Sequence, residues 1–337
     1  MNARIKVGLD VHLRNIVARA IDADTGEIFA SVFDGSDFAG LLAWLEALPG
    51  QREAVYEAGY CGFALARLLI SHGIPCMVTQ GRTLGLGRAK TDALDAEALA
   101  TLLLCKRLQP VYIPTEKQEA QREAARQRYA LAQQRTVVKK RLSAFSHRHG
   151  LPRTMAPDAR ARILGSLSSD DRISFDSLTA QLESAECELA HLDQFMGREV
   201  ERNSDMSALT QLSGIGSVTA FTTAAEAMDF KRFDTARDYV SFLGLVPIPH
   251  DSGGKIVQLG NRKRTPSGAC FYSAATTVMR TGGSFQTDGL ADPENSAIRE
   301  CLASLDRSSR QHGKTHRAAI MARCIAEQAW ALAHRLD

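Results

Sequence analysis

The order of strand-like and helix-like patterns over the first 105 residues constrains the fold of this chain more than any other sequence feature. Three short apolar runs come first, at residues 5–9, 15–21 and 27–33, and turn chemistry at 22–26 separates the second run from the third. A run with apolar residues at spacings of three and four follows at 38–48 and ends at a Pro-Gly pair. The first part therefore predicts an antiparallel meander of three strands.

Alternating patterns complete this segment. They predict a strand at 53–56, a helix at 63–70, a strand at 75–78 and a helix at 92–104. A three-strand meander followed by alternating helices and strands is the order of a ribonuclease H-like domain with a mixed sheet. The predicted fold class is therefore α/β in the first part of the chain, with an all-α remainder.

Four acidic residues fall at informative positions in this order. Asp10 follows the first strand and Glu57 follows the fourth, while Asp92 and Asp95 lie three residues apart at the start of the last helix, on one helical face. Like charges held close repel unless a cation or a proton lies between them. Carboxylates suit Mg²⁺ or Mn²⁺ rather than zinc, and a pair of such ions supports phosphoryl transfer. Taken singly, each residue also fits a strand-end turn, a loop or the solvated first turn of a helix.

The net charge of +3 is unevenly distributed along the chain. Residues 1–105 carry 9 Lys and Arg against 12 Asp and Glu, whereas residues 106–148 carry 11 Lys and Arg against 3 Glu. An acidic domain followed by a basic segment indicates a metal-holding site beside a surface that binds a polyanion. A solubilising helix face is the alternative.

Cysteine usage and hydropathy indicate the compartment. The seven cysteines are scattered and form no CxxC pair, which argues against a zinc module or a disulfide framework and favours a reducing compartment. The N-terminal residues have no long apolar stretch of the signal-peptide type, and no apolar run approaches the roughly 20 residues that span a bilayer. These features predict a cytoplasmic protein with no membrane partner.

Two long runs form the middle of the chain. Residues 116–149 contain no Pro or Gly, and residues 174–203 have apolar residues at spacings of three and four. They predict two helices in an antiparallel coiled-coil hairpin, or two helices of an ordinary bundle. The first helix is basic and could lie along phosphates, whereas the acidic second helix fits dimerisation better.

Two stretches of the C-terminal part could contact phosphate. Gly214 and Gly216 precede a helix predicted to begin near Ser217, so backbone amides could approach a phosphate there, as in a helix-hairpin-helix motif. A tight turn between helices explains the same glycines. Ser252 lies in the sequence HDSGG, which predicts a loop with an exposed hydroxyl followed by basic residues, although an ordinary Ser turn fits as well.

Motifs spread along the chain resemble those of one family. VGLDVH with Asp10, VYEAG with Glu57, and KTDALDAEALA with Asp92 and Asp95 resemble the DEDD transposases of the insertion-sequence "one-ten" family, whose architecture pilin-gene invertases share. The stretches at 209–220, 233–255 and 313–330 are similar to later blocks of the same family, in the same order. One departure follows the serine, where Pro266 is expected to break a helix.

The resemblance implies three segments. They are a RuvC-like catalytic domain over 1–105, a helical coiled-coil segment over 106–203, and a C-terminal transposase domain over 204–337. It implies a recombinase that cuts and rejoins DNA, in which Asp10, Glu57, Asp92 and Asp95 hold Mg²⁺ or Mn²⁺. Ser252 is then the nucleophile that forms a covalent phosphoserine bond.

The resemblance also implies partners. These are DNA at the element ends and target, a structured non-coding guide RNA, and a second or further copies of the chain in a homodimer or homotetramer. The residues expected to contact nucleic acid are Lys90, Arg126, Lys139, Lys140, Gly214, Gly216, Lys255 and Arg262. Two other classes remain open: a junction-resolving metal nuclease that uses water, and a non-catalytic nucleic-acid-binding relative.

Overall fold

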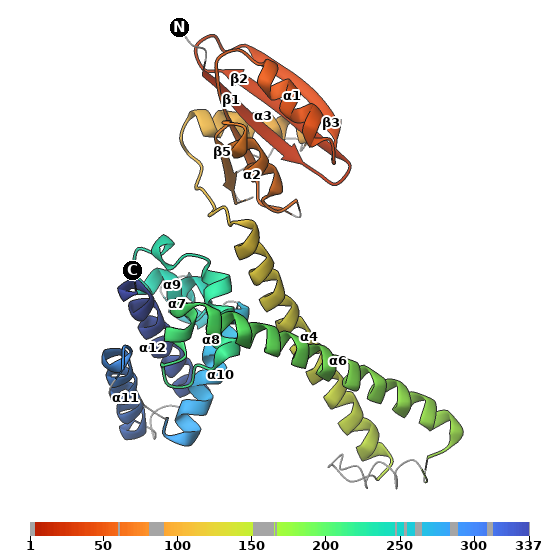
Figure 1. Cartoon of the computed structure of the whole chain (residues 1–337), viewed down its shortest axis with the longest axis vertical. Helices are drawn as coiled ribbons and strands as arrows, with labels where there is room; N and C mark the ends of the chain where they lie inside the picture. The colour runs from red at the N-terminus through yellow and green to blue at the C-terminus, as the bar shows by residue number, and fades with distance from the viewer. Residues whose placement is uncertain are drawn as a thin grey trace. The chain divides into compact units, whose positions relative to one another are not determined.

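The chain forms two compact units, Met1–Thr115 and Glu116–Asp337 (Figure 1). The computed structural model describes residues 4–59, 61–80, 91–150, 165, 167–246, 248–252, 255–259, 265–283, 289–308 and 313–336. The second unit contains the predicted C-terminal segment and residues 116–203 of the predicted helical middle, whose first ten residues belong to the first unit.

The first unit is built on a five-stranded mixed sheet in the order β3-β2-β1-β4-β5. Strands β1, β2 and β3 are antiparallel neighbours, and β4 lies parallel to both β1 and β5. This topology confirms the predicted meander and the mixed sheet of a ribonuclease H-like domain. The strands are β1 (Arg4–Val11), β2 (Asn15–Asp22), β3 (Ile28–Asp34), β4 (Gln51–Glu57) and β5 (Cys76–Thr79).

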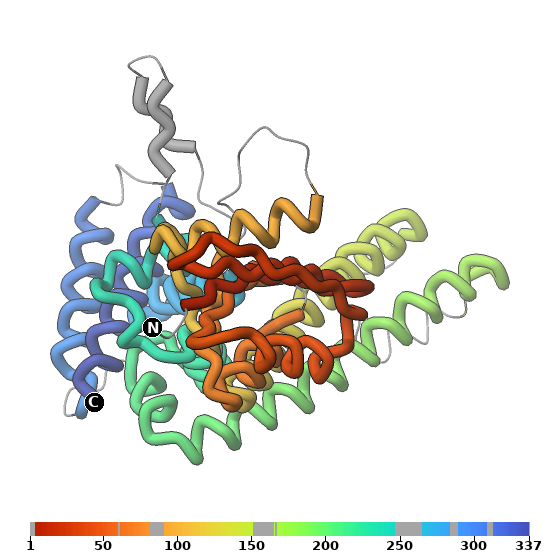
Figure 2. Tube along the Cα trace, turned by 90° about the horizontal axis from the view of Figure 1, so that it is seen from above, coloured from red at the N-terminus to blue at the C-terminus, as the bar shows by residue number. Residues whose placement is uncertain are grey.

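Helices cover the two faces of this sheet. Helices α1 (Phe38–Ala47) and α2 (Ala64–Ser71) pack on the face that buries Ile5, Val7 and Leu9. Helix α3 (Asp92–Leu104) lies on the opposite side of the strands from α1, as Figure 2 shows. Because side chains alternate along a strand, the odd-numbered residues of β1 face α1 and α2, and its even-numbered residues face α3.

The second unit begins with two long helices that pack against each other, α4 (Glu116–Arg148) and α6 (Ser169–Arg202). Val138, Leu142 and Phe145 of α4 meet Phe175 of α6 in a small buried cluster. Helix α4 matches its predicted bounds to within one residue, whereas α6 begins five residues before the predicted start at 174 and ends within one residue of the predicted end. Whether their packing is that of a coiled coil stays a prediction.

The remainder of the second unit is a helical core with one small hairpin. Its largest buried side chains include Phe221, Tyr239 and Phe271, which pack with Met321. The helices are α7 (Ser204–Leu209), α8 (Ser217–Ala227), η1 (Phe230–Arg232), α9 (Ala236–Phe242), α10 (Pro266–Thr281), α11 (Asp292–Arg307) and α12 (Lys314–Arg335), and the hairpin pairs β6 (Ile248–Ser252) with β7 (Lys255–Leu259).

Two local predictions in this unit were wrong. Pro266 does not break a helix but begins α10. Proline is tolerated there because the backbone N–H of the first helical residue has no partner within the helix. The preceding residue, Thr265, caps the helix, since its hydroxyl oxygen accepts a hydrogen bond from the Gly268 amide. Ser252 does not lie in a loop. It is the last residue of β6 and pairs with Lys255 of β7.

Within the described residues, no helix combines the length and the apolar character needed to cross a membrane.

Candidate metal centre

The close approach of α3 to β1 depends on Gly8. A Cβ atom at this position would overlap the Ala96 carbonyl oxygen and would lie 2.6 Å from the Ala100 backbone nitrogen. Only glycine lets a helix backbone come this close to a strand. Ala96 and Ala100 are themselves fully buried, so small residues on α3 complete the contact. The first turn of α3 is thereby brought to the end of β1.

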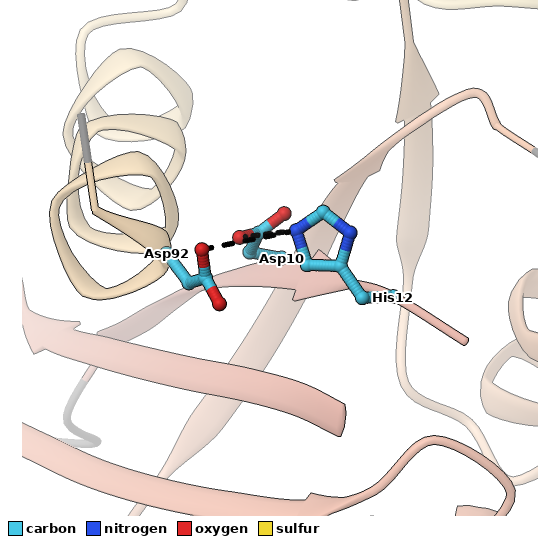
Figure 3. Close-up of side chains that lie close together, drawn as sticks. All are labelled: Asp10, His12 and Asp92. Carbon is cyan, nitrogen blue, oxygen red and sulfur yellow. Dashed lines mark hydrogen bonds and ion pairs between the residues drawn. The ribbon is translucent and has the colours of Figure 1, made fainter. Parts of the chain in front are cut away.

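Three side chains converge where these elements meet (Figure 3). Ligand atoms of Asp10, His12 and Asp92 all lie within 4.8 Å of one another. The His12 Nε2 is 3.0 Å from Asp10 Oδ2 and 4.0 Å from Asp92 Oδ1. Asp10 is the least exposed of the three, with 18 % of its side chain accessible, whereas Asp92 is 52 % exposed. The group is open to solvent on the Asp92 side.

Glu57 lies on the neighbouring strand at the same level as Asp10. In the parallel pair β1–β4, Gly8 is opposite Val55 and Leu9 is opposite Tyr56, which places Glu57 next to Asp10. Val55 packs with Leu99 of α3, so Glu57, two residues further along β4, belongs to the same face of the sheet. Among the described residues, Glu57 is not part of the group within 4.8 Å.

Asp95 also lies outside that group but acts on it electrostatically. Burial is the main cause that raises the pKa of Asp10 above its ordinary value, and the charges of Asp92 and Asp95 raise it further. The hydrogen bond and charge of His12 act in the opposite direction. The predicted acidic residues of β1 and α3 thus share one electrostatic environment, and a bound cation would relieve their repulsion.

The donor set fits a divalent cation. Asp10 and Asp92 offer hard carboxylate oxygens. The two residues lie on different elements, β1 and α3, and the packing of these elements holds the carboxylates close together without a bound ion. Glu57 could supply a further oxygen from the adjacent strand end. These residues could hold one or two ions of the Mg²⁺ or Mn²⁺ type.

His12 was missed by the sequence analysis, although a local signal existed. Residues at i and i+2 of a strand point to the same face, and the sequence LDVH places His12 two residues after Asp10. The His12 amide donates to the Asn15 carbonyl over 2.9 Å and so closes the turn between β1 and β2. This bond extends the strand geometry by one residue and keeps His12 on the face of Asp10.

The predicted nucleophile belongs to the second unit. Ser252 and Lys255 are the paired residues at the end of the β6–β7 hairpin. Lys90 and Arg262, two of the predicted nucleic-acid contacts, lie outside the described residues. The roles of all four stay predictions.

The basic residues of α4 differ in their surroundings. Arg126 makes two hydrogen bonds to the buried carboxylate of Glu226 on α8, at 2.7 and 3.3 Å. Lys139 pairs with Glu186 of α6 at 2.7 Å, whereas Lys140 is exposed. Arg126 is therefore held at a helix–helix contact, and Lys140 is the residue of the three with the freest access to a phosphate.

The two predicted glycines also differ. Gly214 has a φ of +85°, and a Cβ there would lie 2.8 Å from Val278 Cγ2 of α10, so both backbone conformation and packing require glycine. Gly216 is the N-cap of α8, has no side-chain cap and has open space around its Cα. The helix N-terminus at Gly216 is thus the better placed of the two for an anion.

The sheet order and the acidic residues define the class of the first unit. A mixed sheet of five strands, with carboxylates at the ends of two adjacent strands and on a helix that packs over them, is that of a RuvC-like, ribonuclease H-like domain.

Comparison with known families then identifies the chain. The family model described as the DEDD transposase of the IS110 family matches residues 7–146, and the model described as the transposase of the IS116/IS110/IS902 family matches residues 206–288. Together they cover about two thirds of the chain. This protein belongs to the IS110 family of insertion-sequence transposases, as its motifs predicted.

Individual relatives agree with this assignment. The chain is 29 % identical to "Putative transposase y4qE" of Sinorhizobium fredii, over 76 % of this chain and 67 % of the relative. It is 28 % identical to the transposase for insertion sequence element IS1328 of Yersinia enterocolitica, over 52 % of this chain and 54 % of the relative. It is 26 % identical to an uncharacterized protein of insertion element IS116 of Streptomyces clavuligerus, over 83 % and 86 %. The first three curated relatives are matched over 67 %, 65 % and 53 % of their lengths.

Proposed function

We propose that this protein is a transposase that cuts and rejoins DNA strands at a divalent-metal site formed by Asp10, Glu57, Asp92 and Asp95. The observation that carries the proposal is the register of β1 and β4 beneath α3. It gathers acidic residues from three separate elements on one face of the domain that the DEDD transposase model matches. His12 lies close to both Asp10 and Asp92, but one imidazole does not balance the charge of the four acidic residues, and a divalent cation would do so.

The chemistry of the site would be phosphoryl transfer. Divalent ions held by these carboxylates would supply charge stabilisation at the scissile phosphate. In the cutting step the Ser252 Oγ forms a bond to phosphorus, the bond from phosphorus to the 3′ oxygen breaks, and the proton lost by the serine ends on the departing 3′ hydroxyl. The rejoining step is the reverse transfer, with a 3′ hydroxyl as the attacking group.

The two halves of this chemistry belong to different compact units, since the carboxylates lie before residue 115 and Ser252 lies after it. Cutting therefore requires the two units to meet on the same phosphate, within one chain or between two copies. We propose a homodimer or homotetramer that provides this meeting. We also propose a structured guide RNA, for which the support is the family membership and the basic segment 106–148.

The test uses DNA from both flanks of the gene, RNA transcribed from the same flanks, and Mg²⁺ or Mn²⁺. It measures strand cleavage together with a protein–DNA adduct that survives denaturation. The expected result is an adduct with the unmodified protein and its loss in both Ser252→Ala and Asp92→Ala. Ser143→Ala, a change at an exposed position of α4, is the matched control and should retain it.

Each alternative class gives a different outcome. Cleavage that is unchanged in Ser252→Ala and proceeds with no adduct would indicate a nuclease that uses water. Metal-independent binding without cleavage, for both ions and both flanks, would indicate a non-catalytic nucleic-acid-binding relative. Either outcome would overturn the proposed transposase mechanism.

A further inference from the structure

The geometry points to His12 as a direct nitrogen ligand of a metal ion at this site, so that the site holds Mn²⁺ in preference to Mg²⁺. This inference rests on the proposed function, since it concerns the same metal centre. His12 lies outside the set of four carboxylates, and its nitrogen would make the site favour Mn²⁺ over Mg²⁺.

The backbone of His12 is fixed before any ion binds. Its amide donates to Asn15, and its carbonyl oxygen would lie 2.7 Å from a Cβ placed on Gly35, the residue that follows β3. The Gly35 amide donates to the Arg14 carbonyl over 3.0 Å. The turn after β1 is therefore packed against the end of β3, and the His12 side chain starts from a defined position.

The imidazole ring is free to reach a ligand. Its side chain is 52 % exposed, and Nε2 is the ring atom that faces Asp10 and Asp92. The position of the ring follows from the strand and from the two distances.

The distances match those between ligands of one six-coordinate ion. With bonds of about 2.1 Å, neighbouring ligands of an octahedral ion are about 3.0 Å apart and opposite ligands about 4.2 Å apart. The His12 Nε2 lies 3.0 Å from the Asp10 oxygen and 4.0 Å from the Asp92 oxygen. Both separations from Nε2 are therefore close to those that a single shared ion requires, and all three donors lie within 4.8 Å of one another.

Ligand chemistry then sets the preference among ions. Mg²⁺ is bound almost entirely through oxygen and gives up its water reluctantly. Mn²⁺ prefers oxygen ligands too, but it belongs to the first-row series of ions that bind sites of mixed nitrogen and oxygen ligands, so an imidazole costs it less than it costs Mg²⁺. A site with two carboxylates and an imidazole thus favours Mn²⁺. If His12 only donated a hydrogen bond to Asp10, the ion would have oxygen ligands alone and this preference would not arise.

The test is pulsed electron paramagnetic resonance on the full-length protein with Mn²⁺ and without DNA. We expect ¹⁴N modulation from a directly bound imidazole, and its replacement by the ¹⁵N pattern when the protein is labelled with ¹⁵N-histidine. His12→Ala should lose the modulation and bind Mn²⁺ at least about 10-fold more weakly, with a smaller change for Mg²⁺. His191→Ala, an exposed change on α6, is the control and should alter neither quantity.

The outcomes separate this inference from the proposed function. Mn²⁺ binding that Asp92→Asn weakens, but with no nitrogen modulation in the unmodified protein, would overturn the role of His12 and leave the carboxylate site standing. Failure of the unmodified protein to bind Mn²⁺ or Mg²⁺ would overturn both. The ¹⁵N label marks all nine histidines, so it shows that a histidine binds the ion but not which one. If His12→Ala does not fold, His12→Gln, which keeps a polar side chain without a ring nitrogen, should likewise lose the modulation.

Discussion

Gly8 shows how a missing side chain positions a site. It carries no functional group, yet the space above it is filled by the backbone of α3 at Ala96 and Ala100. This contact sets the distance between the strand that carries Asp10 and the helix that carries Asp92. The metal centre thus depends on a residue that contributes no ligand.

Replacement of Gly8 by Ala should therefore impair metal binding. The added methyl group would overlap backbone atoms of α3 at Ala96 and Ala100. Helix α3 must therefore move away from β1, which increases the distance between Asp10 and Asp92. Overpacking of this kind costs about 1–3 kcal/mol of unfolding free energy. Calorimetric Mn²⁺ titration should show weaker binding, and denaturant unfolding should show the loss of stability. Gly197→Ala, in α6 with nothing within 4 Å of the added atom, should leave metal binding unchanged.

Asp10 gives a second prediction at this scale, on pH. Burial raises its pKa in the folded chain, so the folded state binds this proton more tightly than the unfolded state does. In the absence of metal, protonated Asp10 therefore stabilises the folded state. This contribution to the free energy of unfolding is lost as the pH rises above 3.8, the ordinary pKa of an Asp carboxyl group, and through the raised pKa of Asp10. Asp10→Asn should therefore be more stable than the unmodified protein at pH 7 in chelator, with the difference shrinking toward low pH.

Saturating Mn²⁺ should make the unmodified protein more stable than Asp10→Asn, because the metal stabilises only the chain that retains the Asp10 carboxylate. Thermal unfolding with chelator and with metal checks both halves. An Asn variant that is less stable under every condition would contradict the prediction.

At the scale of elements, one buried carboxylate joins α4 to α8. The Glu226 side chain is 1 % exposed and meets Arg126 at 2.7 Å and Arg122 at 3.5 Å. Burial lowers the pKa of Arg122, and the nearby Arg126 charge lowers it further, while Glu226 acts in the opposite direction. The long helix is thus fixed to the C-terminal core by an ion pair whose partners are 100 residues apart.

Arg126→Ala should consequently destabilise the second unit. Loss of one partner of a buried carboxylate costs about 3–5 kcal/mol, and about 2 kcal/mol is expected here because Arg122 remains beside Glu226. Chemical denaturation monitored by circular dichroism measures the change. Lys140→Ala, an exposed change on the same helix, should alter stability by less than about 0.5 kcal/mol. Equal effects of the two substitutions would contradict the role assigned to Glu226.

At the scale of the whole molecule, the two units have separate cores. The sheet residues of the first unit and the helical residues of the second form different buried clusters. The candidate metal ligands all belong to the first unit. Ion binding should therefore stabilise one unit directly and not the other.

Calorimetric unfolding of the full chain should show this as a selective shift. Metal at about 100 times its dissociation constant stabilises the state that binds it by about 2.7 kcal/mol, which raises the transition of the first unit by roughly 10 °C. The transition of the second unit should stay in place, and Asp10→Asn should abolish the shift. A single transition that moves as a whole would show that the units unfold together.

The sequence by itself determined the order of the elements and the positions of the acidic residues along them. Strand alternation, helix periodicity and an Asp at a strand end are local patterns, and the predicted bounds of α3 at 92–104 coincide with the observed helix. The acidic motifs could be placed on elements for the same reason.

Only the tertiary structure decided which of these residues meet. The overlap that forces glycine at position 8, the approach of His12 to Asp92 and the pairing of Arg126 with Glu226 all join segments far apart in the chain. No local pattern encodes such contacts, because each one depends on how whole helices and strands pack. Pro266 and Ser252 are different, because the Thr265 cap and the strand partner Lys255 are close in sequence. Their surroundings were therefore within reach of local patterns.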